Sequence, residues 1–274
     1  MTAATTSASP DAIDRILDDV EPQRQPGPLA NALALAWRVM VKTKRSPGQL
    51  FNATLTPVMF TLIFTYLFGG ALSDSSRSDY LQWLLPGVIV QGVLFISTQT
   101  GVGLSTDLRE GIFDRFKSMP IWRPSPLVGI LLGDLVRYAI SAVVVLAVGL
   151  ALGFRPSGGF GVVAALLIIL LFGFSVSWIW TLVGLVLRTP EAVSGLGMLL
   201  LTVLTFASNI FVDPETMPGW LQGFVAVNPV SLVVTAARGL MAGEAPGELA
   251  GVFISCAALL AVFVPLSLAR YRRS

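Results

Sequence analysis

Six long segments without a single charged residue constrain the fold of this sequence more than any other feature. They comprise residues 46–73, 80–106, 138–154, 156–187, 192–212 and 249–269. Only 12% of all residues are charged and 54% are hydrophobic, whereas about 25% of a soluble protein is charged. A helix that crosses a bilayer needs about 20 apolar residues. The sequence therefore predicts an all-α polytopic membrane protein with six transmembrane helices.

A further uncharged segment, residues 216–237, is not expected to span the membrane. Pro218 and Trp220 stand in an interruption near its start, and Asn228 with Pro229 interrupts it again. The apolar runs that remain are too short for a spanning helix. We expect this segment to be re-entrant or interfacial, with its backbone groups shielded by neighbouring helices.

The Lys and Arg residues are distributed unevenly along the chain. If the N-terminus is cytoplasmic, six spans place only Arg77, Arg155 and Arg238 outside and the other 15 of the 18 basic residues inside. Cytoplasmic loops carry an excess of Lys and Arg. We therefore expect both termini to be cytoplasmic. A seventh span at 216–237 would move the basic C-terminal residues outside.

The two ends of the chain differ from its middle. Residues 1–28 are polar and lack an apolar run, which predicts a disordered tail. In residues 29–46, apolar side chains recur on one helix face: Leu29, Leu33, Trp37 and Met40. With basic residues nearby, this pattern favours an amphipathic interfacial helix. The six-helix domain then covers residues 47–270, and residues 271–274 form a short basic cytoplasmic tail.

A charged stretch between the second and third predicted spans is the candidate partner-binding element. Apolar residues at helical spacing predict an amphipathic helix that ends at Pro120. One interpretation is a surface helix that joins two spans. The other is a docking site for a cytoplasmic partner, with Phe113 and Phe116 as exposed anchors in a charged rim. The candidate docking residues are Glu110, Phe113, Asp114, Arg115, Phe116 and Lys117.

Asp134 and Arg137 precede the third uncharged segment by a few residues. This segment has only 17 residues, or about 25 Å of helix, so we expect its helix to begin earlier and to include both. Three residues apart on one helix, they can form an ion pair. An ion or proton site is the alternative, but we favour a structural pair because the other spans offer no relay of titratable groups.

Uncharged polar residues in the fifth segment are candidates for a substrate path. They are Thr205, Ser208 and Asn209. Most polar residues in membrane helices form hydrogen bonds between helices instead, and that interpretation is favoured here. Without charged rings, an ion-selective pore is not expected.

Several enzyme classes are excluded by composition. The chain has no histidine and one cysteine, which removes Ser-His proteases and histidine-dependent zinc sites. None of its lysines follows a glycine, so the Gly-Lys of a phosphate-binding loop is absent. We expect no catalytic, metal or cofactor site on this chain.

Together, several features resemble the type-2 ABC exporter permeases, in particular those of daunorubicin resistance. These are the six spans, the helix at 29–46, the stretch from Gly111 to Ile121, and the outer stretch from Met217 to Gln222 followed by Asn228 and Pro229. The resemblance covers nearly everything from residue 29 to Arg273. Having both stretches in the same order makes it specific.

This resemblance implies a transmembrane subunit that works with a separate ATPase. Two permease copies, most simply a homodimer, would combine with two ATPase copies that bind ATP and magnesium. Residues 107–119 would be the coupling helix that contacts the ATPase, residues 29–46 an elbow helix, and residues 214–243 the outer re-entrant segment. The implied substrate is a hydrophobic drug or natural product, exported across a bacterial cytoplasmic membrane. No nucleic-acid partner is expected.

Three alternatives stay open at this point. A permease of the same architecture could export a glycan or a lipid-linked substrate. A secondary carrier would need intramembrane carboxylates and an internal repeat, neither of which is evident. An intramembrane enzyme would have to rely on Asp134 or Glu191. Neither the identity of the substrate nor the choice between homodimer and heterodimer follows from the residues.

Overall fold

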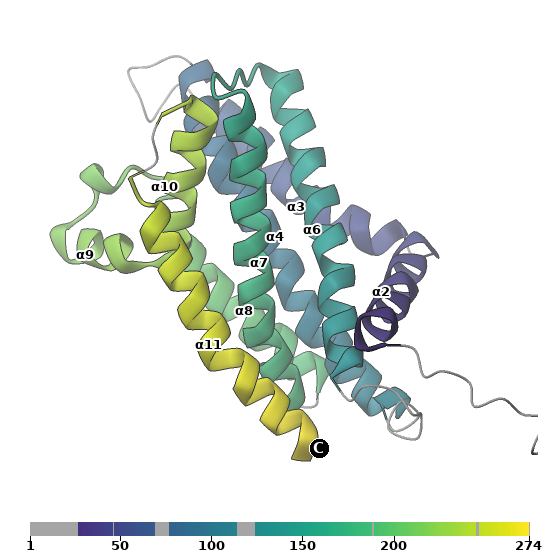
Figure 1. Cartoon of the computed structure of the whole chain (residues 1–274). Coiled ribbons are helices and arrows are strands. Elements are labelled where there is room, and N and C mark those ends of the chain that lie inside the picture. The colour runs from purple at the N-terminus through teal and green to yellow at the C-terminus, as the bar shows by residue number, and fades with distance from the viewer. Residues whose placement is uncertain are drawn as a thin grey trace, which may run out of the picture.

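The computed structural model describes residues 27–45, 47–68, 77–113, 124–187, 189–244 and 247–273. Within these ranges the regular structure is helical, without strands. Figure 1 shows the long helices side by side in a bundle, with the C-terminus at its lower end. Of the tail predicted at 1–28, residues 1–26 lie outside the described ranges.

Four helices are long and apolar enough to cross a membrane. They are α4 (Arg77–Arg109), α6 (Ser125–Leu152), α7 (Phe160–Leu187) and α11 (Leu249–Arg273). Each contains one of the predicted spans. α6 begins well before residue 138, as its short uncharged segment predicted, and thus includes Asp134 and Arg137. α11 continues through Arg273, so residues 271–273 belong to a helix.

The other two predicted spans correspond to shorter helices. α3 (Pro47–Ile63) is continued by a π-helical turn, η1 (Phe64–Phe68), and α8 covers Pro190–Phe206. The 17 residues of α8 measure about 25 Å. The apolar parts of these two helices, Thr54–Leu67 and Pro190–Phe206, are each shorter than a helix that crosses a membrane by itself. The described residues thus include four helices that are able to cross a membrane and two shorter apolar helices.

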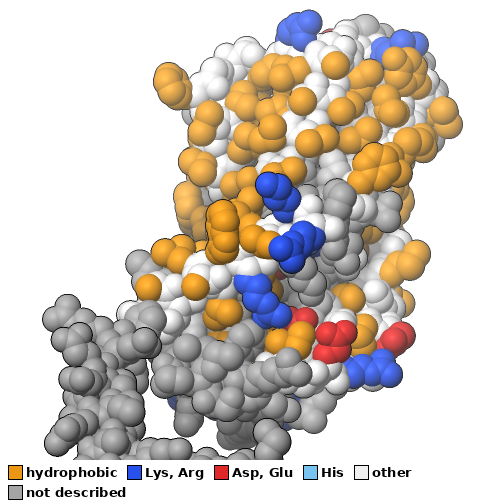
Figure 2. Space-filling model, turned by 90° about the vertical axis from the view of Figure 1, so that its right-hand side faces the viewer, with side chains coloured by type: hydrophobic (Ala, Val, Ile, Leu, Met, Phe, Trp, Pro, Cys, Tyr) orange, Lys and Arg blue, Asp and Glu red, His pale blue; other side chains and the backbone are white. Residues whose placement is uncertain are grey.

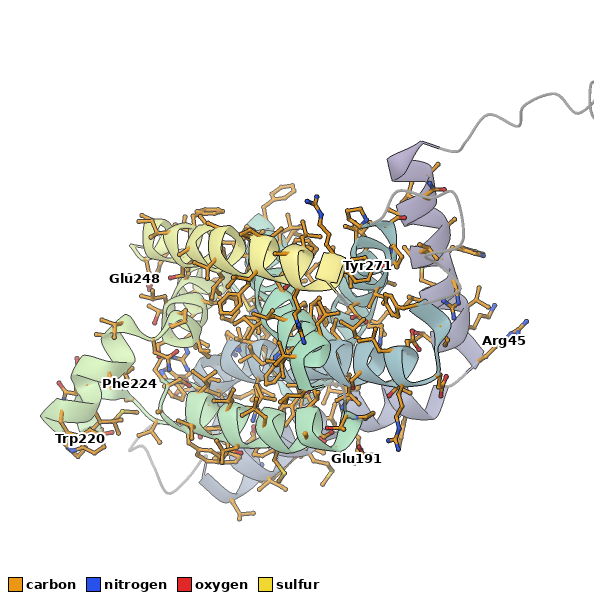
Figure 3. The ribbon with its side chains drawn as sticks, turned by 90° about the horizontal axis from the view of Figure 1, so that it is seen from below. Arg45, Glu191, Trp220, Phe224, Glu248 and Tyr271 are labelled. Atoms are coloured by element: carbon orange, nitrogen blue, oxygen red, sulfur yellow. The ribbon has the colours of Figure 1, made fainter. Side chains whose placement is uncertain are left out.

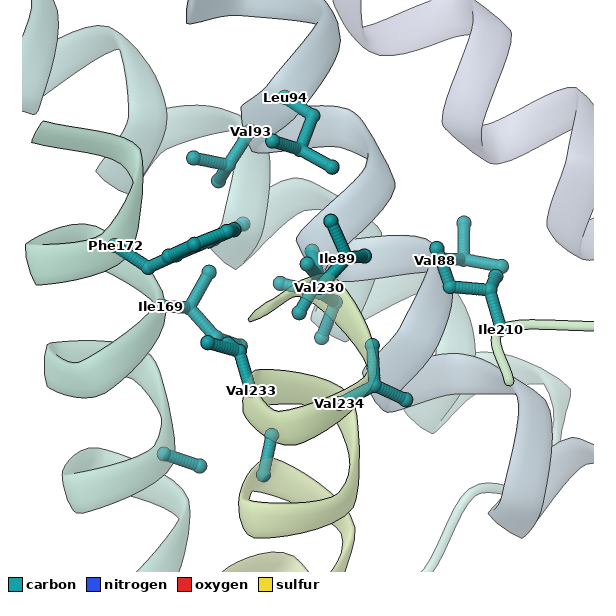
Figure 4. Packing of buried hydrophobic residues seen from close by; sticks show 14 of the residues in the cluster. Val88, Ile89, Val93, Leu94, Ile169, Phe172, Ile210, Val230, Val233 and Val234 are labelled. Atoms are coloured by element: carbon teal, nitrogen blue, oxygen red, sulfur yellow. The ribbon is translucent and has the colours of Figure 1, made fainter. Parts of the chain in front are cut away.

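The core of the bundle is built around α4. In the most apolar part of α4, 83% is buried inside the protein, compared with 50% for α7 and 28% for α6. Figure 4 shows Val93 of α4 and Phe172 of α7 within one buried cluster, which also includes residues of α10 (Pro229–Ala242). Helix α4 contacts α3, α6, α7, α8 and α10, and is therefore the central helix of the bundle.

Glycines allow α4 and α7 to approach each other closely. A Cβ atom added at Gly184 would lie 2.6 Å from the carbonyl oxygen of Gly101, and one at Gly101 would lie 2.6 Å from that of Trp180. Real side chains do not approach a backbone this closely. The crossing of these two helices therefore depends on the absence of a side chain at both glycines.

The predicted helix at 29–46 is present as α2 (Pro28–Arg45) and packs along α6. Ala32 and Ala36 are buried, and they face Gly129, where an added Cβ would lie 3.1 Å from the Ala32 carbonyl oxygen. Leu33 and Trp37 are 54% and 65% exposed. Leu35 and Val39 also lie against glycines of α6. The large residues Leu33 and Trp37 point outward, as expected of an interfacial helix.

The segment predicted to be re-entrant consists of two short helices. α9 (Gly219–Val227) and α10 meet at a bend of 77°. Asn228 lies in extended backbone at φ −69° and ψ 119°, as expected of a residue before proline. Its side chain accepts a hydrogen bond from the Val230 amide at 3.0 Å, which caps α10. The Asn228-Pro229 pair therefore sets the bend.

Candidate functional site

The C-terminal end of α4 leads into the candidate docking stretch. Helix α4 ends at Arg109, and Gly111 follows at φ 70°, a left-handed conformation that favours glycine. Glu110 is exposed on this turn. Arg109 reaches Glu191 at the start of α8 at 3.6 Å, but both side chains are largely exposed, so this ion pair contributes little stability.

Phe113 is buried, which corrects the prediction that it is an exposed anchor. Its side chain is 1% exposed and packs with Leu104, Leu127, Leu185 and Tyr271. Its ring meets that of Tyr271 edge-on, with centroids 5.7 Å apart. The helical pattern identified Phe113 as apolar but could not show that the ends of α4, α6, α7 and α11 converge around it. Phe113 fastens the stretch to the bundle.

The predicted helix at 107–119 is described only in part. Residues 107–109 form the last turn of α4, so this part of the stretch continues the preceding helix. The remaining candidate docking residues lie outside the described residues: Asp114, Arg115, Phe116 and Lys117. A docking role for them therefore stays a prediction.

Asp134 and Arg137 form an ion pair on α6. The Arg137 Nη1 atom donates to Asp134 Oδ1 at 2.8 Å. Thr100 of α4 donates to Asp134 Oδ2 at 2.6 Å. The Tyr138 hydroxyl lies 2.6 Å from the Ser177 hydroxyl of α7. The charged pair thus belongs to a hydrogen-bond network that joins three helices, as a structural pair would.

No cluster suited to a metal ion occurs among the residues that the structure describes, taking groups of three or more Cys, Asp or Glu side chains. The network around Asp134 contains one carboxylate and hydroxyl groups. This part of the protein is therefore suited to holding helices together or to binding polar groups.

The candidate path residues gather where α8 ends. Thr205, Ser208 and Asn209 are all buried. Ser208 donates to the Thr205 carbonyl at 2.6 Å, and Asn209 Nδ2 donates to the Thr235 hydroxyl of α10 at 2.8 Å. These bonds secure the end of α8 against the outer segment. A role of these three residues in the substrate path stays a prediction.

The outer segment combines a fixed end with an exposed end. The Asn228 side chain donates to the Ala207 carbonyl at 2.8 Å, which ties the α9–α10 bend to the end of α8. Trp220 is 77% exposed. Figure 3 shows Trp220 and Phe224 at the edge of the bundle, on the side away from α2. Helix α9 therefore presents an apolar face to its surroundings.

Arg238 of α10 is a functional candidate that the sequence analysis did not single out. Its Nε atom donates to the Trp83 carbonyl at 2.8 Å, and its Nη2 atom donates to the carbonyls of Asn209 at 2.7 Å and Ile210 at 3.2 Å. The guanidinium carbon also lies 3.7 Å from the centroid of the Trp83 ring, a cation–π geometry. One side chain thus joins α10, α4 and the loop after α8. An arginine inside an apolar segment was the available signal.

Comparison with known proteins relates this chain to a family of membrane transporters. A family described as "ABC-2 type transporter" matches residues 31–242. The chain is 50% identical over 238 residues to the daunorubicin resistance ABC transporter permease protein DrrB1 of Streptomyces coeruleorubidus. The alignment covers 86% of this chain and 84% of that protein.

More distant relatives align along most of the chain as well. The probable doxorubicin resistance ABC transporter permease protein DrrC of Mycobacterium tuberculosis is 25% identical over 268 residues, 93% of this chain and 96% of its own length. The inner membrane transport permease YadH of Escherichia coli K12 is 23% identical over 205 residues, 73% of this chain and 76% of its own. The family match of residues 31–242 covers the helices from α3 to α10 and ends before α11.

Proposed function

Because the chain belongs to the ABC-2 type transporter family, we propose that it is the membrane permease subunit of an ATP-driven exporter that carries a hydrophobic drug or natural product out of the cell. The supporting observation is its identity to a permease named for daunorubicin resistance, at half of the positions over most of both chains. The uncharged interior segments of the helices suit a hydrophobic substrate.

A separate ATPase supplies the energy in this proposal. ATP and Mg²⁺ are bound by that partner, and residues 107–119 receive its movement. The end of α4 is a suitable point of contact, since α4 is the most buried helix and Phe113 connects the stretch to the ends of α6, α7 and α11. ATP binding by the partner would then bias the bundle between two arrangements.

The finer topology belongs to the same proposal. α3 with η1 and α8 complete six spans, and both termini lie in the cytoplasm of a bacterial cell, as the distribution of Lys and Arg favours. Residues 214–243 form the outer re-entrant segment. Two permease copies, most simply identical ones, assemble with two ATPase copies. Thr205, Ser208 and Asn209 are the proposed contacts along the substrate path.

Reconstituted transport tests this function. The permease and a candidate partner ABC ATPase are placed in proteoliposomes, and uptake of the fluorescent drug daunorubicin is followed. We expect uptake only when both proteins and hydrolysable ATP are present. Uptake that needs an ion gradient but no ATPase would refute the proposal in favour of a secondary carrier.

The docking stretch is tested in the same system with two matched variants. Phe116→Ala changes the proposed docking stretch, whereas Phe160→Ala changes a phenylalanine that is 94% exposed at the start of α7. We expect the first to reduce co-purification with the ATPase and the second to leave it unchanged. Equal behaviour of the two variants would remove the stretch from the proposed contact.

A further inference from the structure

A cavity of about 480 Å³ lies where α2, α3, α4 and α6 meet. This volume is in the range of sites that hold small molecules. Its lining includes the charged residues Arg38 of α2, Asp107 of α4, and Asp134 and Arg137 of α6. Nothing in the proposed transport function uses this cavity, which we call the α2 cavity.

The α2 cavity lies at the level where α4 changes from uncharged to charged. The charge-free segment of α4 ends at residue 106, directly before Asp107. On α6, Asp134 and Arg137 interrupt an otherwise uncharged helix, since residues 124–133 and 138–152 carry no charge. In a membrane protein such a boundary marks the level of the lipid headgroups.

The charges that line the cavity balance each other. Two guanidinium groups and two carboxylates sum to zero, which favours a ligand that has no net charge but carries separate opposite charges. Asp134 already accepts hydrogen bonds on both oxygens, from Arg137 and Thr100. A guanidinium has five N–H donors, and the Arg137 Nε atom has no hydrogen-bond partner among the described residues. Arg137 therefore retains donors for an acceptor-rich group.

An apolar strip continues from the cavity along the bundle. On α6, the side chain of Val136 beside Arg137 is exposed, and so are those of Ile140, Val143 and Val144 beyond it. On α3, which contacts α6, the side chains of Leu55, Met59 and Ile63 are exposed. Figure 2 shows a broad area of hydrophobic side chains on this face, with basic side chains at its top edge and around and below the middle of the molecule. A polar end followed by an apolar strip matches a molecule with a charged head and hydrocarbon tails.

We propose that the α2 cavity binds the headgroup of a zwitterionic phospholipid with a primary ammonium group, of the phosphatidylethanolamine type. Its phosphate accepts hydrogen bonds from Arg137 and Arg38, and its ammonium group lies toward the carboxylate of Asp107. Its acyl chains follow the exposed residues of α3 and α6. Asp134 acts through Arg137, whose guanidinium it orients. The bound lipid would fix α2 against the bundle at the membrane surface.

Native mass spectrometry of the purified full chain tests this site without the ATPase, so its outcome is independent of transport. The protein is equilibrated with equal amounts of phosphatidylethanolamine and phosphatidylglycerol with the same acyl chains. We expect at least a roughly fivefold preference for phosphatidylethanolamine, the ratio that one net charged hydrogen bond supplies. Equal retention, or preference for the anionic lipid, would overturn the assignment.

Two pairs of variants locate the binding. Arg137→Met should weaken retention of the lipid, because it removes a donor to the phosphate, whereas Arg109→Met, which changes an exposed arginine near the end of α4, should keep it. Gly103 lines the cavity, and a Cβ there meets no atom within 4 Å. Gly103→Leu should therefore fill the cavity without a clash at its Cβ and weaken retention.

Gly195→Leu is the control for the second pair, because a Cβ at this position of α8 also meets no atom within 4 Å. Unchanged lipid retention in both Arg137→Met and Gly103→Leu would refute the proposed site. Equal loss in Gly195→Leu would do the same, since that residue is not part of the cavity lining. Thermal unfolding of all four variants establishes that they are folded.

Discussion

Arg238→Met should loosen the outer segment from the rest of the bundle. The substitution keeps an apolar stem but removes the donors that satisfy the carbonyls of Asn209 and Ile210. Asn209 and Ile210 follow the end of α8, so their carbonyls do not accept the hydrogen bonds of a helix. A polar group left buried without a partner costs about 1–3 kcal/mol, so two of them cost roughly 2–6 kcal/mol. Burying the methionine recovers about 1–2 kcal/mol, which leaves a net loss of about 0–5 kcal/mol, centred near 2.5 kcal/mol.

Thermal unfolding in detergent and hydrogen exchange measure this effect. The unfolding temperature should fall, and amides in residues 228–242 should exchange faster, while those of α7 should change little. Arg238→Lys keeps the charge but not the forked donors, so its unfolding temperature should lie between those of Arg238→Met and the wild type. Arg155→Met is the matched control, because among the described residues the side chain of Arg155 donates only to the nearby carbonyls of Leu150 and Phe154. Unchanged exchange in Arg238→Met would refute the role given to this side chain.

Two further substitutions test the packing that carries movement through the bundle. Phe113→Ala should cost about 3–5 kcal/mol, as for other buried phenylalanines, and weaken co-purification with the ATPase; Phe113→Leu should retain most of both, and a fully stable Ala variant would contradict the burial. Gly184→Ala should lower the unfolding temperature by an overpacking cost of about 1–3 kcal/mol, since its Cβ would lie 2.6 Å from the Gly101 carbonyl. Gly103→Ala, whose Cβ meets nothing within 4 Å, is the control, and equal stability of the two would argue against a tight crossing.

The sequence predicted the long helices well because hydropathy dominates structure in a membrane. An apolar segment free of charges has few alternatives to a helix there, since its backbone groups must bond within the segment. The ion pair of Asp134 and Arg137 was predictable for a similar reason. Three residues on a helix bring two side chains to one face whatever lies around them.

Contacts between distant segments were not predictable in the same way. A helical pattern marks Phe113 as apolar, but its burial depends on Tyr271 and on the ends of three other helices. Likewise, the three carbonyls that bind Arg238 come from α4 and from the loop after α8. Sequence spacing within one segment carries no information about such partners. The α2 cavity depends on four helices at once and was missed for this reason.

The sidedness of the bundle is the claim on which ATPase coupling depends, and cysteine labelling tests it most directly. In a Cys256→Ala background, single cysteines replace Glu110, Arg272 or Glu215, which are exposed. With a membrane-impermeant maleimide on intact cells, the account predicts labelling at position 215 alone, and labelling at 110 and 272 only after the membrane is permeabilised. Labelling of position 110 or 272 on intact cells would contradict it, because an ATPase in the cytoplasm could not then contact the end of α4.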